Sequence, residues 1–590
     1  MKIGKFLGKF LIWRVKHINH RQFILLLSFI VGILSGLAAV VLKNSIYYTN
    51  YFLLNGFSIT QDNYLFLLYP LFGILLTVLF VNILIKDNIG HGVARILYSI
   101  SKNKSNLKSH NSFSSIIAST LTIGFGGSVG SEAPIVLTGA SIGSNLAKLL
   151  RLDYRARTLL IGCGSAGAIA GIFNAPLAGI IFTLEVLMLD LTLSSIVPLL
   201  ISSVTASTLA YFFMGKGFLL KADLHIFELH QIPYYIVLGI ITGLVSIYFT
   251  RGNFYVESLF KKINSTPKKL MLGGSVLAIL IFFFPSLYGE GYEALQTILE
   301  GHASHLVNNN PFSFSLNNTW IFIGYLLLIL FFKVIAMSVT TGAGGVGGIF
   351  APTLFMGGIT GLLVSRIFNI FSNQAVSESD FALVGMGGLM AGVMHAPLTG
   401  IFLIAEITGG YSLFIPLMIT ATISYLTIIY FEPYSIYTKR LAQRGELLTH
   451  DTDKSVLTLM QLDRIIETDL KTVSPEATLG ELVKVVSQSN RNIFPVIDSE
   501  NTLIGIILLD HIRDIMFDRS LYDNTCVTSL MIMPPTYVSS TDSMDCVMKK
   551  FSETKVWNLP VINNGKYVGF ISKSKIFNSY RDILTKYSTE

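Results

Sequence analysis

Residues 171–180 read GIFNAPLAGI, and residues 392–401, 221 positions further on, read GVMHAPLTGI. A second matched pair lies upstream of these stretches, GSEAP at residues 130–134 and GIFAP at residues 348–352. Glycine and proline thus interrupt corresponding apolar runs in two halves of the chain. In a bilayer, broken helices are tolerated only where they line a protein cavity or a water-filled path. Corresponding breaks in two repeats indicate a central transport site.

The composition is that of a polytopic membrane protein with a soluble appendage. Of the 590 residues, 52% are hydrophobic and only 13% are charged, which argues against a soluble enzyme. The net charge of +8 does not indicate a nucleic-acid partner, because the first 21 residues alone carry six basic residues and no acidic one. We interpret residues 1–21 as a basic amphipathic helix on the inner leaflet. The positive-inside rule makes both termini cytoplasmic, and we expect a bacterial inner membrane.

The apolar runs stop near residue 440. We assign residues 22–439 to the transmembrane domain and residues 440–459 to a polar linker. Two smaller copies follow, at residues 460–520 and 521–590, in which NIFPVID precedes LIGII and NLPVIN precedes YVGFI. These β-branched runs predict short strands that alternate with helices. The region resembles a tandem pair of CBS domains, which stack together and often bind adenine nucleotides.

The residues that hold the ribose in nucleotide-binding CBS domains are altered here. In the first copy Leu508 takes the hydroxyl position and His511 the carboxylate position. In the second copy Ser572 keeps the hydroxyl, but Lys575 replaces the carboxylate. We therefore predict a structural or dimerising role for the pair. An adenine nucleotide held through Ser572, Lys575 and a phosphate is the alternative, and neither a metal nor a required cofactor is expected.

The first broken motif has the chemistry of an anion site. Its glycines let the backbone turn sharply and let an ion approach closely, and Pro134 suits the first turn of a helix. The free N–H groups and the positive dipole end of that helix then attract an anion. Glu132 lies at the same spot and is itself an anion, which can occupy the site, swing away or be protonated. An ionisable residue inside a membrane is a functional candidate by default.

With its second-half partner, this motif resembles the CLC family of chloride channels and chloride/proton antiporters. In the family's Gly-Arg-Glu-Gly-Pro motif the Glu is the gate and the external proton acceptor, which implies both roles for Glu132. The resemblance places Gly130 and Ser131, the latter at the Arg position, among the anion-binding residues. The family's Gly-x-Phe-x-Pro motif is matched in full, which implies that the backbone N–H groups of Ile349 and Phe350 bind the central anion.

Two further matches complete the predicted anion path. GHGVA at residues 90–94 aligns with the family's Gly-Ser-Gly-Ile-Pro, so His91 stands at the position of an anion-binding serine. We expect its ring N–H to donate to the anion, or, if the ring points elsewhere, the N–H of Gly92 alone to do so. Tyr434, at the end of the last apolar run, takes the place of a family tyrosine whose hydroxyl contacts the anion. A membrane-boundary anchor is the alternative for this tyrosine.

One absence shapes the predicted mechanism. In many family antiporters, the segment that matches residues 171–180 is followed by two adjacent glutamates, and the second is the internal proton acceptor. Here Glu185 is followed by Val186. We therefore expect a chloride channel with passive permeation gated by Glu132, and chloride/proton antiport through the same residues is the alternative. A third hypothesis makes the CBS pair a ligand sensor that controls the pore. Glu185 and its repeat counterpart Glu406 are interpreted as structural acceptors of hydrogen bonds from nearby helix ends.

The expected fold is an all-α polytopic membrane domain of two inverted repeats with broken helices, followed by cytoplasmic α+β tandem CBS domains. The family resemblance implies a homodimer in the lipid bilayer with one pore per subunit. Chloride is the expected transported ion, and fluoride and nitrate are the alternatives.

Overall fold

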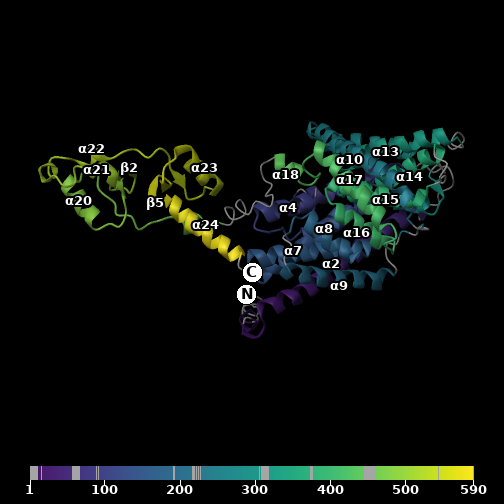
Figure 1. Cartoon of the computed structure of the whole chain (residues 1–590), viewed down its shortest axis with the longest axis horizontal. Coiled ribbons are helices and arrows are strands. Elements are labelled where there is room, and N and C mark those ends of the chain that lie inside the picture. Colours follow the sequence, from purple (N-terminus) through teal and green to yellow (C-terminus); the bar gives the residue numbers. More distant parts are fainter. Residues whose placement is uncertain are drawn as a thin grey trace. The chain divides into compact units, whose positions relative to one another are not determined.

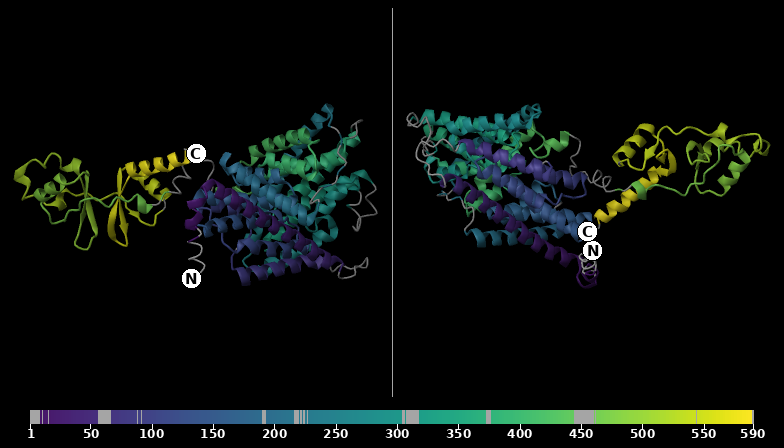
Figure 2. Two further views of the ribbon diagram at one scale, coloured as in Figure 1. Left: turned by 90° about the horizontal axis from the view of Figure 1, so that it is seen from below. Right: turned by 180° about the vertical axis from the view of Figure 1, so that it is seen from behind.

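The computed structural model divides the chain into two compact units, Met1–Leu447 and Leu448–Glu590 (Figure 1 and Figure 2). Most of the predicted linker and the first eight residues of the predicted N-terminal helix lie outside the described residues. The residues that the structure describes are 9, 11–14, 16–55, 67–87, 89–90, 92–189, 193–215, 220, 222, 225, 227–303, 306, 318–371, 376–443, 460, 462–542 and 544–588.

The first unit is helical throughout its described elements, as predicted. Among the described residues, eight helices are long and apolar enough to cross a membrane. The α-helices are α2 (His20–Asn55), α3 (Tyr69–Leu79), α4 (Gly92–Lys102), α5 (Asn111–Gly124), α6 (Glu132–Leu149), α7 (Tyr154–Phe173), α8 (Pro176–Glu185), α9 (Leu193–Met214), α10 (Ile232–Lys261), α11 (Thr266–Phe283), α12 (Tyr292–Leu299), α13 (Thr319–Gly342), α14 (Phe350–Phe371), α15 (Glu378–Met394), α16 (Pro397–Ile407), α17 (Phe414–Phe431) and α18 (Lys439–Gln443). Short π- and 3-10 turns add η2 (Phe80–Ile85), η3 (Leu229–Gln231) and η4 (Pro285–Leu287).

The duplicated NAP and HAP segments break two helices in the same way. Asn174 ends α7 with φ 55° and ψ 37°, and α8 begins two residues later at a proline. His395 ends α15 with φ 55° and ψ 42°, and α16 likewise begins two residues later at a proline. The left-handed residue stops each helix, and the proline starts the next without losing a helical hydrogen bond. The two halves of the unit therefore share one local geometry.

Glycine lets the paired helices of each repeat approach to backbone contact. In the first repeat α6 packs against α7, where a Cβ on Gly164 would stand 1.9 Å from the carbonyl oxygen of Gly139. In the second repeat α14 packs against α15, where a Cβ on Gly361 would stand 1.9 Å from the carbonyl oxygen of Phe381. Small residues at membrane helix interfaces allow this close approach. The two helix pairs form the rigid base on which the broken segments are held.

The second unit is the predicted α+β repeat. β1 (Ile493–Ile497) pairs antiparallel with β2 (Leu503–Leu508), and β4 (Asn558–Asn563) pairs antiparallel with β5 (Lys566–Ser572). Both ladders shift register at the same place, between Val496 and Ile497 and between Val561 and Ile562, as expected for a duplication. The remaining elements are β3 (Val538–Ser539), η7 (Leu462–Arg464), η8 (Arg519–Leu521), α20 (Leu479–Ser487), α21 (Leu509–Ile512), α22 (Val527–Leu530), α23 (Met544–Thr554) and α24 (Lys573–Ser588).

Candidate functional site

The two glycine motifs meet face to face in the middle of the membrane unit. The backbone N–H of Gly130 donates to the carbonyl oxygen of Gly348 at 2.9 Å, and the N–H of Gly348 donates back at 2.6 Å. A Cβ on Gly348 would stand 2.9 Å from the Cβ of Ala133, so the approach needs glycine. This bridge brings together the first turns of α6 and α14, and with them the predicted residues Ser131, Glu132, Ile349 and Phe350. Two positive helix ends therefore converge on one spot.

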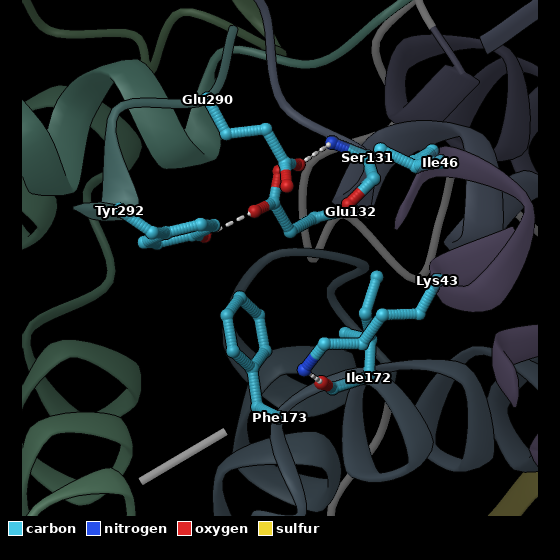
Figure 3. Close-up of a pocket in the computed structure, with 8 residues that line it drawn as sticks. All are labelled: Lys43, Ile46, Ser131, Glu132, Ile172, Phe173, Glu290 and Tyr292. Atoms are coloured by element: carbon cyan, nitrogen blue, oxygen red, sulfur yellow. Dashed lines mark hydrogen bonds between the residues drawn. The ribbon is translucent and has the colours of Figure 1, made fainter. Parts of the chain in front are cut away.

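The carboxylate of Glu132 lies at this convergence. The residue is 2% exposed, and its Oε1 accepts a 2.5 Å hydrogen bond from the hydroxyl of Tyr292 (Figure 3). Its Oε2 is buried and turned toward the backbone N–H of Ala351 in the first turn of α14, without reaching hydrogen-bond geometry. The acidic side chain thus lies where the starts of two helices meet, a position that also suits an anion.

A second carboxylate, which the sequence analysis did not single out, stands beside the gate. Glu290 Oε1 accepts a 2.8 Å hydrogen bond from the backbone N–H of Ser131. Figure 3 shows the carboxyl groups of Glu290 and Glu132 side by side. Glu290 is held between two glycines in left-handed conformations, Gly289 with φ 62° and Gly291 with φ 90°. Glycine adopts such angles more readily than other residues do, so the two glycines let the chain turn on both sides of this acid.

Two lysines lie around the acids. Lys43 of α2 reaches the carbonyl oxygen of Ile172 at 3.4 Å. Lys333 of α13 is fully buried, and its ammonium donates to the hydroxyl of Ser128 at 2.9 Å. The Lys333 ammonium also reaches the carbonyl oxygen of Gly289 at 3.4 Å, and it lies within electrostatic reach of Glu290, as does Lys43. Buried charges need such opposite partners, so the lysines support the acidic pair.

A cavity of about 70 Å³ opens between these groups. One buried water needs roughly 10–15 Å³, so the space accommodates several waters or a small anion. On one side, the ring of Phe173 stacks on that of Phe350 with centroids 5.3 Å apart, which joins the break of the first repeat to the start of α14. The residues that line the cavity are Lys43, Ile46, Ser131, Glu132, Ile172, Phe173, Glu290 and Tyr292 (Figure 3).

The buried tyrosine near Glu132 is Tyr437, whereas Tyr434, for which an anion contact was predicted, lies at the surface. Tyr434 is 44% exposed, whereas Tyr437 is 8% exposed and lies within electrostatic reach of Glu132. Gly92 begins α4 against the gate helix, since a Cβ there would stand 2.6 Å from the carbonyl oxygen of Ala133. His91 lies outside the described residues, so its predicted contact with the anion is untested.

The structural interpretation of the two repeat glutamates is confirmed. Glu185, at the end of α8, accepts from the backbone N–H groups of Leu398 at 3.0 Å and of Thr399 at 2.7 Å, at the start of α16. The hydroxyl of Thr399 adds a third bond at 2.6 Å. Glu406, at the end of α16, accepts from the N–H groups of Leu177 at 3.0 Å and of Ala178 at 2.8 Å. Each carboxylate therefore caps the helix start of the opposite repeat.

Val186 follows Glu185 directly and is buried, with 4% of its surface exposed. A valine side chain offers no group that can bind a proton. The position where many family antiporters carry a second glutamate therefore supplies no proton acceptor in this chain.

In the second unit, the hydroxyl of Ser572, which would contact a nucleotide in the alternative interpretation, is already engaged. Ser572 Oγ donates a 2.5 Å hydrogen bond to Oε1 of Glu467 and accepts from the backbone N–H of Lys575 at 3.2 Å. The same Glu467 pairs with Arg491 of the first copy at 2.6 Å. This network ties the two copies together through polar side chains.

Sequence reasoning missed five described residues around Glu132. They are Lys43, Glu290, Tyr292, Lys333 and Tyr437. Two of them carried a usable signal, because Lys333 is the one charged residue of α13 and Glu290 interrupts an uncharged run between glycines. Lone charges in membrane segments are candidates for function.

Sequence comparison then gives these features a family context. A sequence model described as "Voltage gated chloride channel" matches residues 72–428, and a CBS domain model matches residues 462–518 and 527–582. The "Putative chloride channel protein ClcB-like" of Ralstonia nicotianae is 31% identical over 341 residues, which cover 56% of this chain and 74% of that protein. The "H(+)/Cl(-) exchange transporter ClcA" of Yersinia pestis is 31% identical over 309 residues, 51% of this chain and 61% of the transporter. The chain thus spans less than two thirds of that relative.

Solved structures share the fold. A structure described as a slow cyanobacterial Cl−/H+ antiporter superposes with a TM-score of 0.61 at 24% identity, covering 73% of this chain and all of that chain. A eukaryotic CLC transporter superposes with a TM-score of 0.59 at 17% identity, covering 94% of this chain and 97% of its own.

Proposed function

Because the chain belongs to the voltage gated chloride channel family, we propose that this anion transporter exchanges chloride for protons, with Glu132 as both gate and proton acceptor. The observation that carries the proposal is the Glu132 carboxylate at the joint start of α6 and α14. An ionised carboxylate competes with chloride for this position, because both are attracted by the same helix ends.

Protonation links the two ions. When Glu132 takes up a proton it loses its charge, and its attraction to the start of α14 weakens. Chloride then takes the vacated position, so that proton binding and chloride binding favour each other. Such coupling is reciprocal, so the occupancy of the site by one ion controls its occupancy by the other. In this cycle, the hydroxyl of Tyr292 favours the ionised carboxylate by donating to Oε1.

The relatives favour exchange over the passive channel expected from Val186. Several of them are named H(+)/Cl(-) exchange transporters, and a further solved structure that shares the fold is described as a fluoride/proton antiporter. Val186 favours a passive channel, as does the name of the ClcB-like relative, a putative chloride channel, and we keep the passive channel as the second candidate function. In the exchange cycle, protons reach the gate from the inner side through water or through side chains other than Val186.

Reconstituted liposomes test the proposal. An outward chloride gradient should drive steady proton uptake, measured with a pH electrode in weakly buffered medium. Glu132→Gln should abolish proton uptake while chloride efflux persists, because the amide cannot bind a proton at these pH values. Chloride efflux from wild-type liposomes without proton movement would instead favour the passive channel.

The remaining features of the proposal follow from the family. We propose a homodimer with one transport path per subunit, in a bacterial inner membrane and with both termini cytoplasmic. Chloride is the proposed substrate, and flux with fluoride or nitrate as the sole anion tests the alternatives. Light scattering of the purified protein in detergent tests the dimer, since a monomer mass would refute it.

The CBS pair is proposed to be structural. The Ser572 hydroxyl is already engaged by Glu467, so ribose contact would break a hydrogen bond within the protein. We expect calorimetry of the full chain with ATP, AMP or cyclic dinucleotides to show no binding. A saturable heat, lost in Lys575→Ala, would support the alternative in which the pair senses a nucleotide.

A further inference from the structure

The proposed gate, Glu132, faces a second acid, Glu290. Figure 3 shows the carboxyl groups of Glu132 and Glu290 turned toward one another, one from the start of α6 and one from the loop before α12. The loop carrying Glu290 is fastened to the gate motif, because Oε1 of Glu290 accepts from the N–H of Ser131 at 2.8 Å. Oε2 of Glu132 is buried and makes no hydrogen bond, although the residue is only 2% exposed. A buried, unpartnered oxygen beside a second acid is an acceptor that lacks a proton.

Electrostatics predicts that the pair shares one proton. Two carboxylates at close quarters in a low-dielectric site repel each other, so they do not both stay ionised. Their protonation is then a property of the pair and not of either residue alone. The Tyr292 hydroxyl already donates to Oε1 of Glu132, which leaves Oε2 of Glu132 as the atom that receives the shared proton.

The surroundings of the two acids favour proton transfer from Glu290 to Glu132. Glu290 is partly exposed while Glu132 is buried, and both line the cavity. Lys333 is held by the hydroxyl of Ser128 and lies within electrostatic reach of Glu290, which stabilises a negative charge there. The titratable groups facing the pair are Lys43 from α2, Tyr292 from α12, Lys333 from α13 and Tyr437 from the segment after α17.

We propose that Glu290 is a second proton acceptor, which takes protons from the cavity and passes them to Glu132. In this step the O–H bond on Glu290 breaks as an O–H bond forms on Oε2 of Glu132. The negative charge thereby moves from Glu132 to Glu290, where Lys43 and Lys333 stabilise it. Neutral Glu132 is then released from the start of α14. The inference extends the proposed function, but the same transfer also sets the pH dependence of chloride flux in a passive channel.

Charge removal at Glu290 tests the role, with full-length protein in liposomes. Glu290→Gln keeps an oxygen that accepts from the Ser131 N–H but removes the charge that favours a proton on Glu132. The pH of half-maximal chloride flux should fall by about one unit or more, and proton flux at neutral pH by about tenfold. Chloride flux at low pH should stay within about twofold of wild type, because Glu132 is then protonated without help. Glu290→Asp should restore the wild-type profile in large part.

Glu293→Gln is the matched control, because Glu293 is an exposed acid of the adjoining helix α12. It should leave both fluxes and the pH profile unchanged. A Glu290→Gln protein with the wild-type pH profile and proton flux would overturn the proposal. Loss of chloride flux at every pH in both Glu290 variants would also overturn it, since Glu290 would then only hold the loop. If the wild-type protein moves no protons, the exchange fails, while the pH shift of chloride flux still decides the role of Glu290.

Discussion

Removing the carboxylate of Glu185 should destabilise the membrane unit more than removing that of Glu406. Glu406 caps α8 through two charge-assisted bonds to backbone N–H groups, while Glu185 caps α16 through two such bonds and a third from the Thr399 hydroxyl. Hydrogen bonds to charged groups contribute about 1.5–3 kcal/mol each. Taking the low end for partly exposed helix starts, Glu406→Ala should cost about 3 kcal/mol and Glu185→Ala about 4.5 kcal/mol.

Thermal unfolding in detergent, followed by the loss of monodisperse protein on gel filtration after heating, gives the order of stability. Thr399→Val removes only the third bond of Glu185 and should cost about 1.5 kcal/mol, so its melting temperature should lie closest to that of wild type. Glu406→Ala should melt lower, and Glu185→Ala lowest. Chloride flux at low temperature should survive in all three variants, because neither glutamate touches the proposed path. Equal melting of the two glutamate variants, or no loss in either, would refute the capping argument.

Three further outcomes are expected from the contacts. Gly130→Ala places a Cβ 2.1 Å from Oε2 of Glu132 and should expel the carboxylate, so that chloride flux loses its pH dependence; an unchanged pH profile would contradict the packing. Tyr292→Phe removes a donor to the ionised gate and should move half-maximal flux to higher pH by up to about one unit, whereas a shift to lower pH would contradict the assigned hydrogen bond. In the CBS unit, a hydrogen bond from Lys550 holds the pKa of Asp542 below its usual range. This pair therefore stabilises the folded state fully above about pH 4, the usual pKa of an aspartate. The stabilisation is lost as the pH falls through the lowered pKa that Asp542 has in the folded state. Asp542→Asn should remove this contribution, which is below about 1 kcal/mol in the free energy of unfolding. Thermal unfolding measured across pH should then show a correspondingly smaller loss of stability in acid.

Most of the architecture could be predicted because the signals were local and repeated. The NAP and HAP breaks, the two glycine motifs and the strand pairs of the second unit are read from neighbouring residues. The caps made by Glu185 and Glu406 could be predicted as well, because matching acids at the ends of duplicated helices need matching donors. The location of Glu132 at the start of a helix could likewise be predicted from the neighbouring glycine and proline.

The rest of the site depends on tertiary contacts that local patterns do not encode. Glu290 and Lys333 lie far from Glu132 in the sequence, and only helix packing brings Glu290 to the cavity beside Glu132 and Lys333 within electrostatic reach of Glu290. The choice between Tyr434 and Tyr437 depends on how the chain turns after α17. Tyr434 is exposed and Tyr437 is buried three positions later, a difference that the sequence alone does not give. The expected passive channel rested on Val186 alone, a single absence that says nothing about other proton routes.

Uphill transport tests the central claim most directly. Liposomes containing the purified protein are prepared with equal chloride on both sides and a pH gradient of one unit. Protons that leave the more acidic side should drive chloride into that side, so chloride should accumulate there against its own gradient. The account predicts this accumulation in wild type and its loss in Glu132→Gln. Chloride that stays at equal concentration in wild type, while it moves freely down an imposed gradient, would contradict coupled exchange.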